Sequence, residues 1–224
     1  MAIKLFETFG LSETRKHEIK KFIIIFYIVG LAGLLVPATT EFFKLITPLA
    51  LILNFVILTA YHRGDFSRKL IFVFLGIYIF GFLIEVIGVK SSLIFGEYTY
   101  GVTLGPKVFD TPLIIGLNWL FLCYVSNSVL EKYNIHISLK IIGASLLMLI
   151  YDIVLEQVAP LLDFWYWGDN AVPLQNYAAW FVIALVFNSA VKLLKISTKN
   201  AMSKIVFITQ FLFFLLLYVF YTWI

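Results

Sequence analysis

The stretch that decides the fold reads YDIVLEQVAPLLDFWYW, from Tyr151 to Trp167. It begins inside an apolar run and leaves that run through Pro160 into the aromatic cluster Trp165-Tyr166-Trp167, a pattern typical of a membrane-spanning helix that ends at an interface. The run nevertheless carries Asp152 and Glu156, which lie one turn apart on one face of a helix. Because ionisable side chains within a span usually face a partner or a cavity, the pair predicts a buried acidic site.

Two carboxyl groups one turn apart can share a proton, since two like charges at short range repel each other. A structural hydrogen-bonded pair, or a helix end that reaches the interface, is the alternative interpretation. We favour the functional interpretation, in which an acid held protonated in an aromatic-walled pocket is the reactive centre.

Composition places the chain in the membrane. The 224 residues are 62% hydrophobic and only 13% charged, whereas a soluble domain is roughly one quarter charged. We therefore expect an all-α, polytopic membrane helical bundle. The net charge of +4 does not call for a nucleic-acid partner, because positive charge in such proteins usually marks cytoplasmic loops. The single cysteine, Cys123, excludes an internal disulfide and is interpreted as a small apolar packing residue.

The pattern predicts two parts. Residues 1–21 form a charged N-terminal segment in which Ile3, Leu5, Phe6 and Phe9 lie on the membrane surface and Ser12 caps the next helix. Residues 22–224 form a single transmembrane domain. Seven apolar segments of about the length of a spanning helix follow one another in it: Phe22–Val36, Phe42–Tyr61, Leu70–Val89, Pro112–Leu130, Leu139–Val158, Asn176–Leu194 and Ile205–Ile224.

The distribution of positive charge predicts the orientation. With the N-terminus inside, 14 of the 17 lysines and arginines fall on inner segments, and only Lys44, Lys90 and Lys107 fall on outer ones. The positive-inside rule then places the N-terminus in the cytoplasm and the C-terminus outside. Two long outer connections, Lys90–Thr111 and Ala159–Gln175, are rich in aromatic residues and glycine and should meet on the outer side.

Other polar and aromatic residues allow two interpretations each. Glu85 lies in apolar sequence, and it either joins the acidic site or snorkels to the outer surface. The loop from Phe95 to Pro106 is either a surface loop with interfacial tyrosines or a re-entrant lid over a cavity. Trp165 and Trp167 suit an interfacial aromatic belt, and their ring faces could also stabilise a cation. For Asn188 we expect a hydrogen bond between helices.

Several chemistries lack their usual sequence signal. The histidines, His17, His62 and His136, lie on predicted inner segments without the clustered spacing of a membrane di-iron enzyme, so we expect no metal site. No Asp-Asp-x-x-Asp motif, no lysine within the last span and no phosphate-binding glycine loop is present. These absences argue against a prenyltransferase, a retinal protein and a nucleotide-binding protein.

An ordered set of motifs resembles the carotenoid biosynthesis protein family, which includes membrane carotenoid 1,2-hydratases. The resemblance spans roughly Glu85 to Trp180. Its motifs are Glu85-x-x-Gly88, Phe95-Gly96-x-Tyr98-x-Tyr100, Leu104-Gly105-Pro106, Thr111-Pro112-Leu113, Asn118-Trp119, Asp152-x-x-x-Glu156, Trp165-x-Trp167 and Val172-Pro173-Leu174-x-Asn176-Tyr177-x-x-Trp180. The chain departs from the family pattern at Ser91–Ile94, at Glu156 and at Gln175, where the family often has Thr-Gly, aspartate and serine.

The resemblance implies addition of water across the terminal C1–C2 double bond of an acyclic carotenoid end, giving a tertiary alcohol without a cofactor. Its implied partners are an acyclic or monocyclic carotenoid, the bilayer of the cell membrane, and other enzymes of carotenoid synthesis. The catalytic candidates are Asp152, Glu156 and Glu85, with Asp152 as proton donor because it lies deeper in its span. The candidate substrate-binding residues are Tyr98, Tyr100, Asp110, Asn118, Trp119, Trp165, Trp167, Asn176 and Trp180.

This chemistry suits the residues, because an alkene is a weak base and needs a neutral acid in a water-poor site. The resulting cation needs aromatic faces and a nearby carboxylate. Two alternatives stay open. One is a membrane isomerase like lycopene cyclase, which quenches the same cation by ring closure. The other is a membrane protein that binds a carotenoid or lipid without catalysis.

Overall fold

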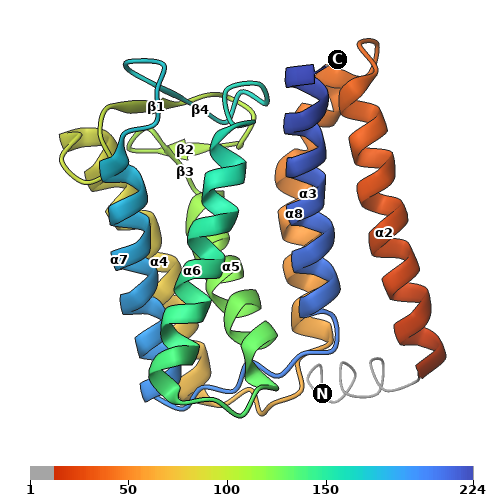
Figure 1. The fold of residues 1–224 in the computed structure, drawn as a ribbon, viewed down its shortest axis with the longest axis vertical. Coiled ribbons are helices and arrows are strands. Elements are labelled where there is room, and N and C mark those ends of the chain that lie inside the picture. The colour runs from red at the N-terminus through yellow and green to blue at the C-terminus, as the bar shows by residue number, and fades with distance from the viewer. Residues whose placement is uncertain (1–12, 224) are drawn as a thin grey trace.

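The computed structural model describes residues 13–223, which form seven helices (Figure 1). The predicted surface position of Ile3, Leu5, Phe6 and Phe9, and the Ser12 cap, lie outside the described residues. The helices are α2 (Glu13–Leu35), α3 (Thr40–Ala60), α4 (Arg68–Ser91), α5 (Ile114–Glu131), α6 (Ile137–Glu156), α7 (Leu174–Leu193) and α8 (Ser203–Trp223).

These helices confirm the all-α bundle, and six of them, α3 to α8, are long and apolar enough to cross a membrane. They indicate a multi-pass membrane protein.

Helix α2 differs from the prediction because it begins nine residues before Phe22. The extra turns contain charged residues that propagate a helix well, with no Gly or Pro to end it. Glu18, Lys20 and Lys21 make the first half of α2 more polar than the other helices.

The connections separate into two ends of the bundle. The α3–α4, α5–α6 and α7–α8 connections lie at one end, and the two long aromatic connections lie together at the other (Figure 1). The meeting of these two connections was predicted from the sequence. Which end faces the cytoplasm stays a prediction from the charge distribution.

Helix α5 occupies the centre and contacts α3, α4, α6, α7 and α8. Its stretch from Trp119 to Asn127 is buried without interruption. Glycine permits its close approach to α4, because a Cβ at Gly116 would lie 2.6 Å from the carbonyl oxygen of Tyr78. The expected inter-helix bond of Asn188 is present, since its Nδ2 donates to the Ser145 hydroxyl at 3.0 Å.

The long connections fold over the end of the bundle and form two small antiparallel sheets there. Strand β1 (Tyr98–Tyr100) pairs with β4 (Trp165–Trp167), and β2 (Lys107–Val108) pairs with β3 (Thr111–Pro112). These strands are two or three residues long, too short for an alternating pattern to reveal them in the sequence. Gly96 has a φ of +106°, and a Cβ there would lie 2.7 Å from Cγ of Pro173. Glycine therefore lets the first connection pack against the start of α7.

Candidate functional site

Glu85 on α4 is only 4% exposed and lies inside the bundle, so it does not snorkel to the surface. Its Oε2 accepts hydrogen bonds from the Tyr98 hydroxyl at 2.7 Å and the Tyr100 hydroxyl at 2.8 Å. Its Oε1 accepts a third from Nε1 of Trp119 at 2.9 Å. These three donors favour the ionised form of the Glu85 side chain, because a carboxylate accepts hydrogen bonds through both oxygens.

Tyr98 and Tyr100 come from strand β1, above the end of α4. Burial raises the pKa of both hydroxyls above the ordinary value, and the neighbouring carboxylate of Glu85 raises it further. Both residues therefore remain phenols and donate to Glu85. Phe95 and Leu104 of the same loop are also buried. The loop consequently packs over the site as a cover.

Glu156, at the end of α6, is held in a similar way. Its Oε2 accepts from the indole nitrogens of Trp165 at 2.9 Å and Trp167 at 2.8 Å. Its Oε1 accepts from Nδ2 of Asn176 at 3.1 Å. The two tryptophans are less than 10% exposed, so they line the interior instead of forming an interfacial belt.

Asp152 lies one turn below Glu156 and is fully buried. Asn176 Nδ2 also donates to its Oδ2, at 3.3 Å, so one amide joins the two carboxyl groups. The other oxygen, Oδ1, has no hydrogen-bond partner within residues 13–223. Asp152 is thus the least solvated of the three acids. A protonated carboxyl needs fewer hydrogen-bond donors around it than a carboxylate, so this environment suits the protonated form of Asp152.

The pairing of β1 with β4 unites the two halves of the site. Tyr98 lies opposite Trp167 and Tyr100 lies opposite Trp165. The facing rings contact each other, with centroids 5.2 Å apart for Tyr98–Trp167 and 6.1 Å apart for Tyr100–Trp165. The donors to Glu85 and the donors to Glu156 are therefore cross-strand neighbours.

A polar cavity of about 20 Å³ lies within this cluster and has room for about one water molecule. Trp119 and Trp180 stack beside it with ring centroids 3.9 Å apart, and Trp180 contributes to its wall. The lining residues are Glu85, Phe95, Tyr98, Tyr100, Ile115, Asn118, Glu156, Trp165, Trp167, Asn176 and Trp180. Asp152 is behind this wall and not part of it.

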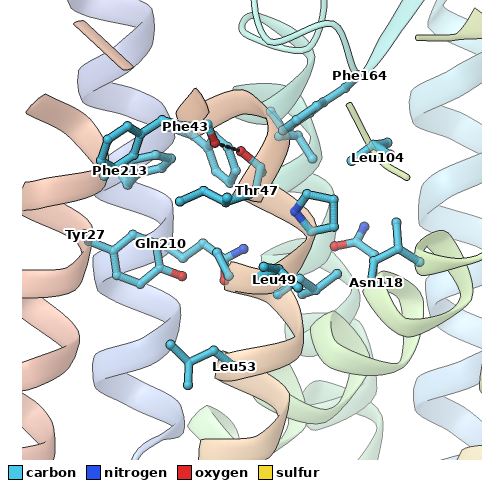
Figure 2. Close-up of a pocket in the computed structure, with 18 of the residues that line it drawn as sticks. Tyr27, Phe43, Thr47, Leu49, Leu53, Leu104, Asn118, Phe164, Gln210 and Phe213 are labelled. Carbon is cyan, nitrogen blue, oxygen red and sulfur yellow. Dashed lines mark hydrogen bonds between the residues drawn. The ribbon is translucent and has the colours of Figure 1, made fainter. Parts of the chain in front are cut away.

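A second, apolar cavity of about 520 Å³ lies next to the first, between α2, α3, α5, α6 and α8 (Figure 2). Its size falls within the roughly 300–1,000 Å³ of pockets that bind drug-sized ligands. Val29 and Leu49 line it and are 52% and 61% exposed, so the cavity reaches the lipid-facing surface. Ile115, Asn118 and Trp165 line both cavities. An apolar chain in the large cavity would therefore end beside the small polar one.

The structure brings together all the predicted site residues except Asp110. Asp110 is exposed and pairs with Lys90, whose hydrogen bond and, next, positive charge lower the pKa of the aspartate. It lines neither cavity, and its predicted role in substrate binding gains no support from this position.

Sequence reasoning missed the far wall of the large cavity. Helices α2, α3 and α8 contribute residues such as Tyr27, Phe43 and Phe213, which have no signal that separates them from lipid-facing residues (Figure 2). Gln210 could have been found, because it is a lone amide within the apolar run of α8.

Fold and site together define a polytopic helical membrane protein with a buried acidic cluster at the end of an apolar cavity. Comparison with protein families gives the particular group: residues 46–224 match the carotenoid biosynthesis protein family, and the chain belongs to it. A stretch of 131 residues is 30% identical to bisanhydrobacterioruberin hydratase of Haloarcula japonica, covering 53% of this chain. The match spans 42% of that relative's length. No solved structure matches.

Proposed function

We propose that this protein is a membrane hydratase that adds water across the terminal C1–C2 double bond of an acyclic carotenoid end group. The observation that carries the proposal is the water-sized polar cavity between Glu85 and Glu156, which shares walls with the large apolar cavity. The apolar cavity suits the end of a hydrocarbon chain, and the small cavity suits the water that attacks it. The resemblance to a carotenoid hydratase is consistent with this arrangement.

The first step is proton transfer to the alkene carbon that carries a hydrogen, which leaves a tertiary cation. We assign the proton to the Asp152–Glu156 pair, which one amide joins. Asp152 holds it at rest because it accepts only one hydrogen bond. Glu156, the member of the pair on the cavity wall, gives a proton to the alkene, and Asp152 then reprotonates Glu156. General acid catalysis of this kind contributes roughly 10²–10⁴-fold.

The second step is attack of water on the cation. Glu85 lines the same small cavity as Glu156 and is held by three donors. As a carboxylate it balances the positive charge, together with the faces of the surrounding aromatic rings. The proton that the attacking water loses returns to the carboxyl cluster, so atoms and charge balance with no cofactor.

Ring closure of the same cation, as in a cyclase, needs no water at the reactive carbon. The water-sized cavity between the acids therefore favours hydration over cyclisation. We place the protein in the cell membrane, with this site at the outer side as the charge distribution predicts, where other enzymes of carotenoid synthesis would supply its substrate.

The test is expression of the chain in cells that accumulate lycopene, followed by extraction of the pigments. A more polar product heavier by one water molecule is expected. A cyclic product of unchanged mass would replace the hydratase with a cyclase, and unchanged pigment would favour a protein that binds carotenoid without catalysis.

A further inference from the structure

The large and the small cavity meet at three residues that line both of them, Ile115, Asn118 and Trp165. Ile115 has no polar group in its side chain, and the indole nitrogen of Trp165 donates to Glu156 at 2.9 Å. The side chain of Asn118 makes no hydrogen bond within residues 13–223. Of these three residues, Asn118 therefore has the one polar side chain that is available to a ligand.

Asn118 lies in the first half of α5 and is half-buried, and Figure 2 shows its amide among the apolar side chains of the large cavity. An amide that faces hydrocarbon without a hydrogen-bond partner is unfavourable, because the water that it bonded in the unfolded chain is not replaced. The next residue, Trp119, does have a partner, since its Nε1 donates to Glu85. The position of Asn118 is therefore suited to a small polar molecule at the junction of the cavities.

We propose that Asn118 binds the attacking water and directs it at the cation, so that this residue determines whether the cation is hydrated. The inference rests on the proposed function for the reaction. It adds a residue with a separate task, because the carboxyl groups generate the cation and Asn118 commits it to hydration.

The size of the small cavity brings Asn118 and Glu85 to the same water. The cavity has room for about one molecule, so the polar groups on its wall reach that molecule together. Glu85 accepts two hydrogen bonds at Oε2 and one at Oε1. Because a carboxylate has about four acceptor positions, Oε1 retains one. The water donates one hydrogen to this oxygen and the other to the amide oxygen of Asn118, and a lone pair remains for the carbon.

Other side chains of the small cavity do not fill this role. The hydroxyls of Tyr98 and Tyr100 already donate to Glu85. The indole nitrogen of Trp180 has no hydrogen-bond partner in the described part of the chain, but it only donates, so it binds a lone pair of the water instead of a hydrogen. Asn118 accepts a hydrogen, and it alone of these residues also lines the large cavity, where the cation forms.

Without a directed water, the cation has another outcome. It loses a proton to the carboxyl cluster, either from C2 or from a methyl group on C1, and the electron pair of that C–H bond becomes the new double bond. The product then has the composition of the substrate. In D₂O the acid first delivers a deuteron to C2, so this product carries deuterium whenever an ordinary hydrogen is the one that leaves.

The test separates formation of the cation from its capture by water. Membranes that contain the full chain are incubated with lycopene in D₂O, and the extracted pigments are analysed by mass. We expect mainly hydrated pigment from the wild type. Asn118→Leu should lower the hydrated pigment roughly 10²-fold, the effect of misplacing a reacting group by about 1 Å, and should give deuterium in pigment with the composition of lycopene. Asn118→Asp keeps an acceptor oxygen at the same position and should hydrate more than Asn118→Leu.

Asn134→Leu is the matched control, because Asn134 is exposed on the α5–α6 connection and lines neither cavity. It should hydrate at the wild-type rate, whereas Asp152→Asn should give neither hydrated pigment nor deuterium. Wild-type hydration by Asn118→Leu would overturn the inference and leave the hydratase proposal standing. Loss of both products in both Asn118 variants would also overturn it, because a residue that only directs water does not affect protonation. Neither product from the wild type would instead overturn the proposed function, and this inference with it.

Discussion

Replacing Asp152 with asparagine tests the proposed acid directly. The aspartate accepts one hydrogen bond, from Asn176 at 3.3 Å, and its other oxygen has no partner within residues 13–223. The new amide can keep its oxygen toward Asn176 and place its NH₂ group where the free oxygen was. The cost to folding is then one unpartnered buried donor, about 1–3 kcal/mol, so the variant should still insert and fold.

The effect on hydration should be much larger, because the amide has no proton to pass to Glu156. General acids contribute roughly 10²–10⁴-fold, which corresponds to about 2.7–5.4 kcal/mol of transition-state stabilisation at about 1.36 kcal/mol per tenfold. We expect Asp152→Asn to leave almost no hydrated pigment in lycopene-accumulating cells. Glu156→Gln should also remove most of the product, because Glu156 is the member of the pair that faces the small cavity.

Asp169→Asn provides the matched control, since Asp169 is an exposed carboxyl on the second long connection and lines neither cavity. It should hydrate at the wild-type rate. If Asp152→Asn makes product at near the wild-type rate while Glu85→Gln does not, the donor is on α4 and our assignment is wrong. If Asp152→Asn, Glu156→Gln and Glu85→Gln all remain active, the carboxyls are structural and the proposed mechanism fails.

Three further predictions concern orientation and the cover of the site. A cysteine at Ser92, in a Cys123→Ala background, should react with an impermeant thiol reagent from outside intact cells, and reaction only after lysis would reverse the predicted topology. Gly101→Ala should lower the thermal stability of the purified protein, because the new Cβ would lie 2.1 Å from Oδ1 of Asp163 and push the two long connections apart. An unchanged melting temperature would show that these two connections separate easily. Trp167→Phe removes one of two indole donors to the α6 carboxylate, so hydration should slow roughly 10- to 150-fold, the effect of a lost hydrogen bond to a charged group, and full activity would show that this bond is not needed.

The sequence by itself determined the membrane bundle. Spans such as Leu70–Val89 and Leu139–Val158 lie within two residues of α4 and α6, because burial in lipid requires a continuous apolar run and this requirement is local. The same requirement makes carboxyl groups in a span conspicuous, so Glu85, Asp152 and Glu156 were identified without any knowledge of contacts.

The tertiary structure decided which of these residues meet. Strand β1 pairs with β4, and these come from two separate connections, so no local pattern could reveal that Tyr98 and Trp167 serve neighbouring carboxyl groups. Asp110 lies in the same aromatic loop region by sequence, yet its turn has positive φ and it pairs with Lys90 on the surface. Adjacency in sequence does not fix the direction of a side chain.

The cavity is the clearest case of what the tertiary structure alone decided. Its walls come from five helices and the two long connections, and an apolar residue that faces this space is indistinguishable in sequence from one that faces lipid. Only packing separates Phe213, which lines the cavity, from Leu212, which is exposed on the next face of α8. The physical reason is that hydropathy reports only which environment a side chain prefers. The position of a cavity depends instead on where helices that are distant in sequence leave space between them.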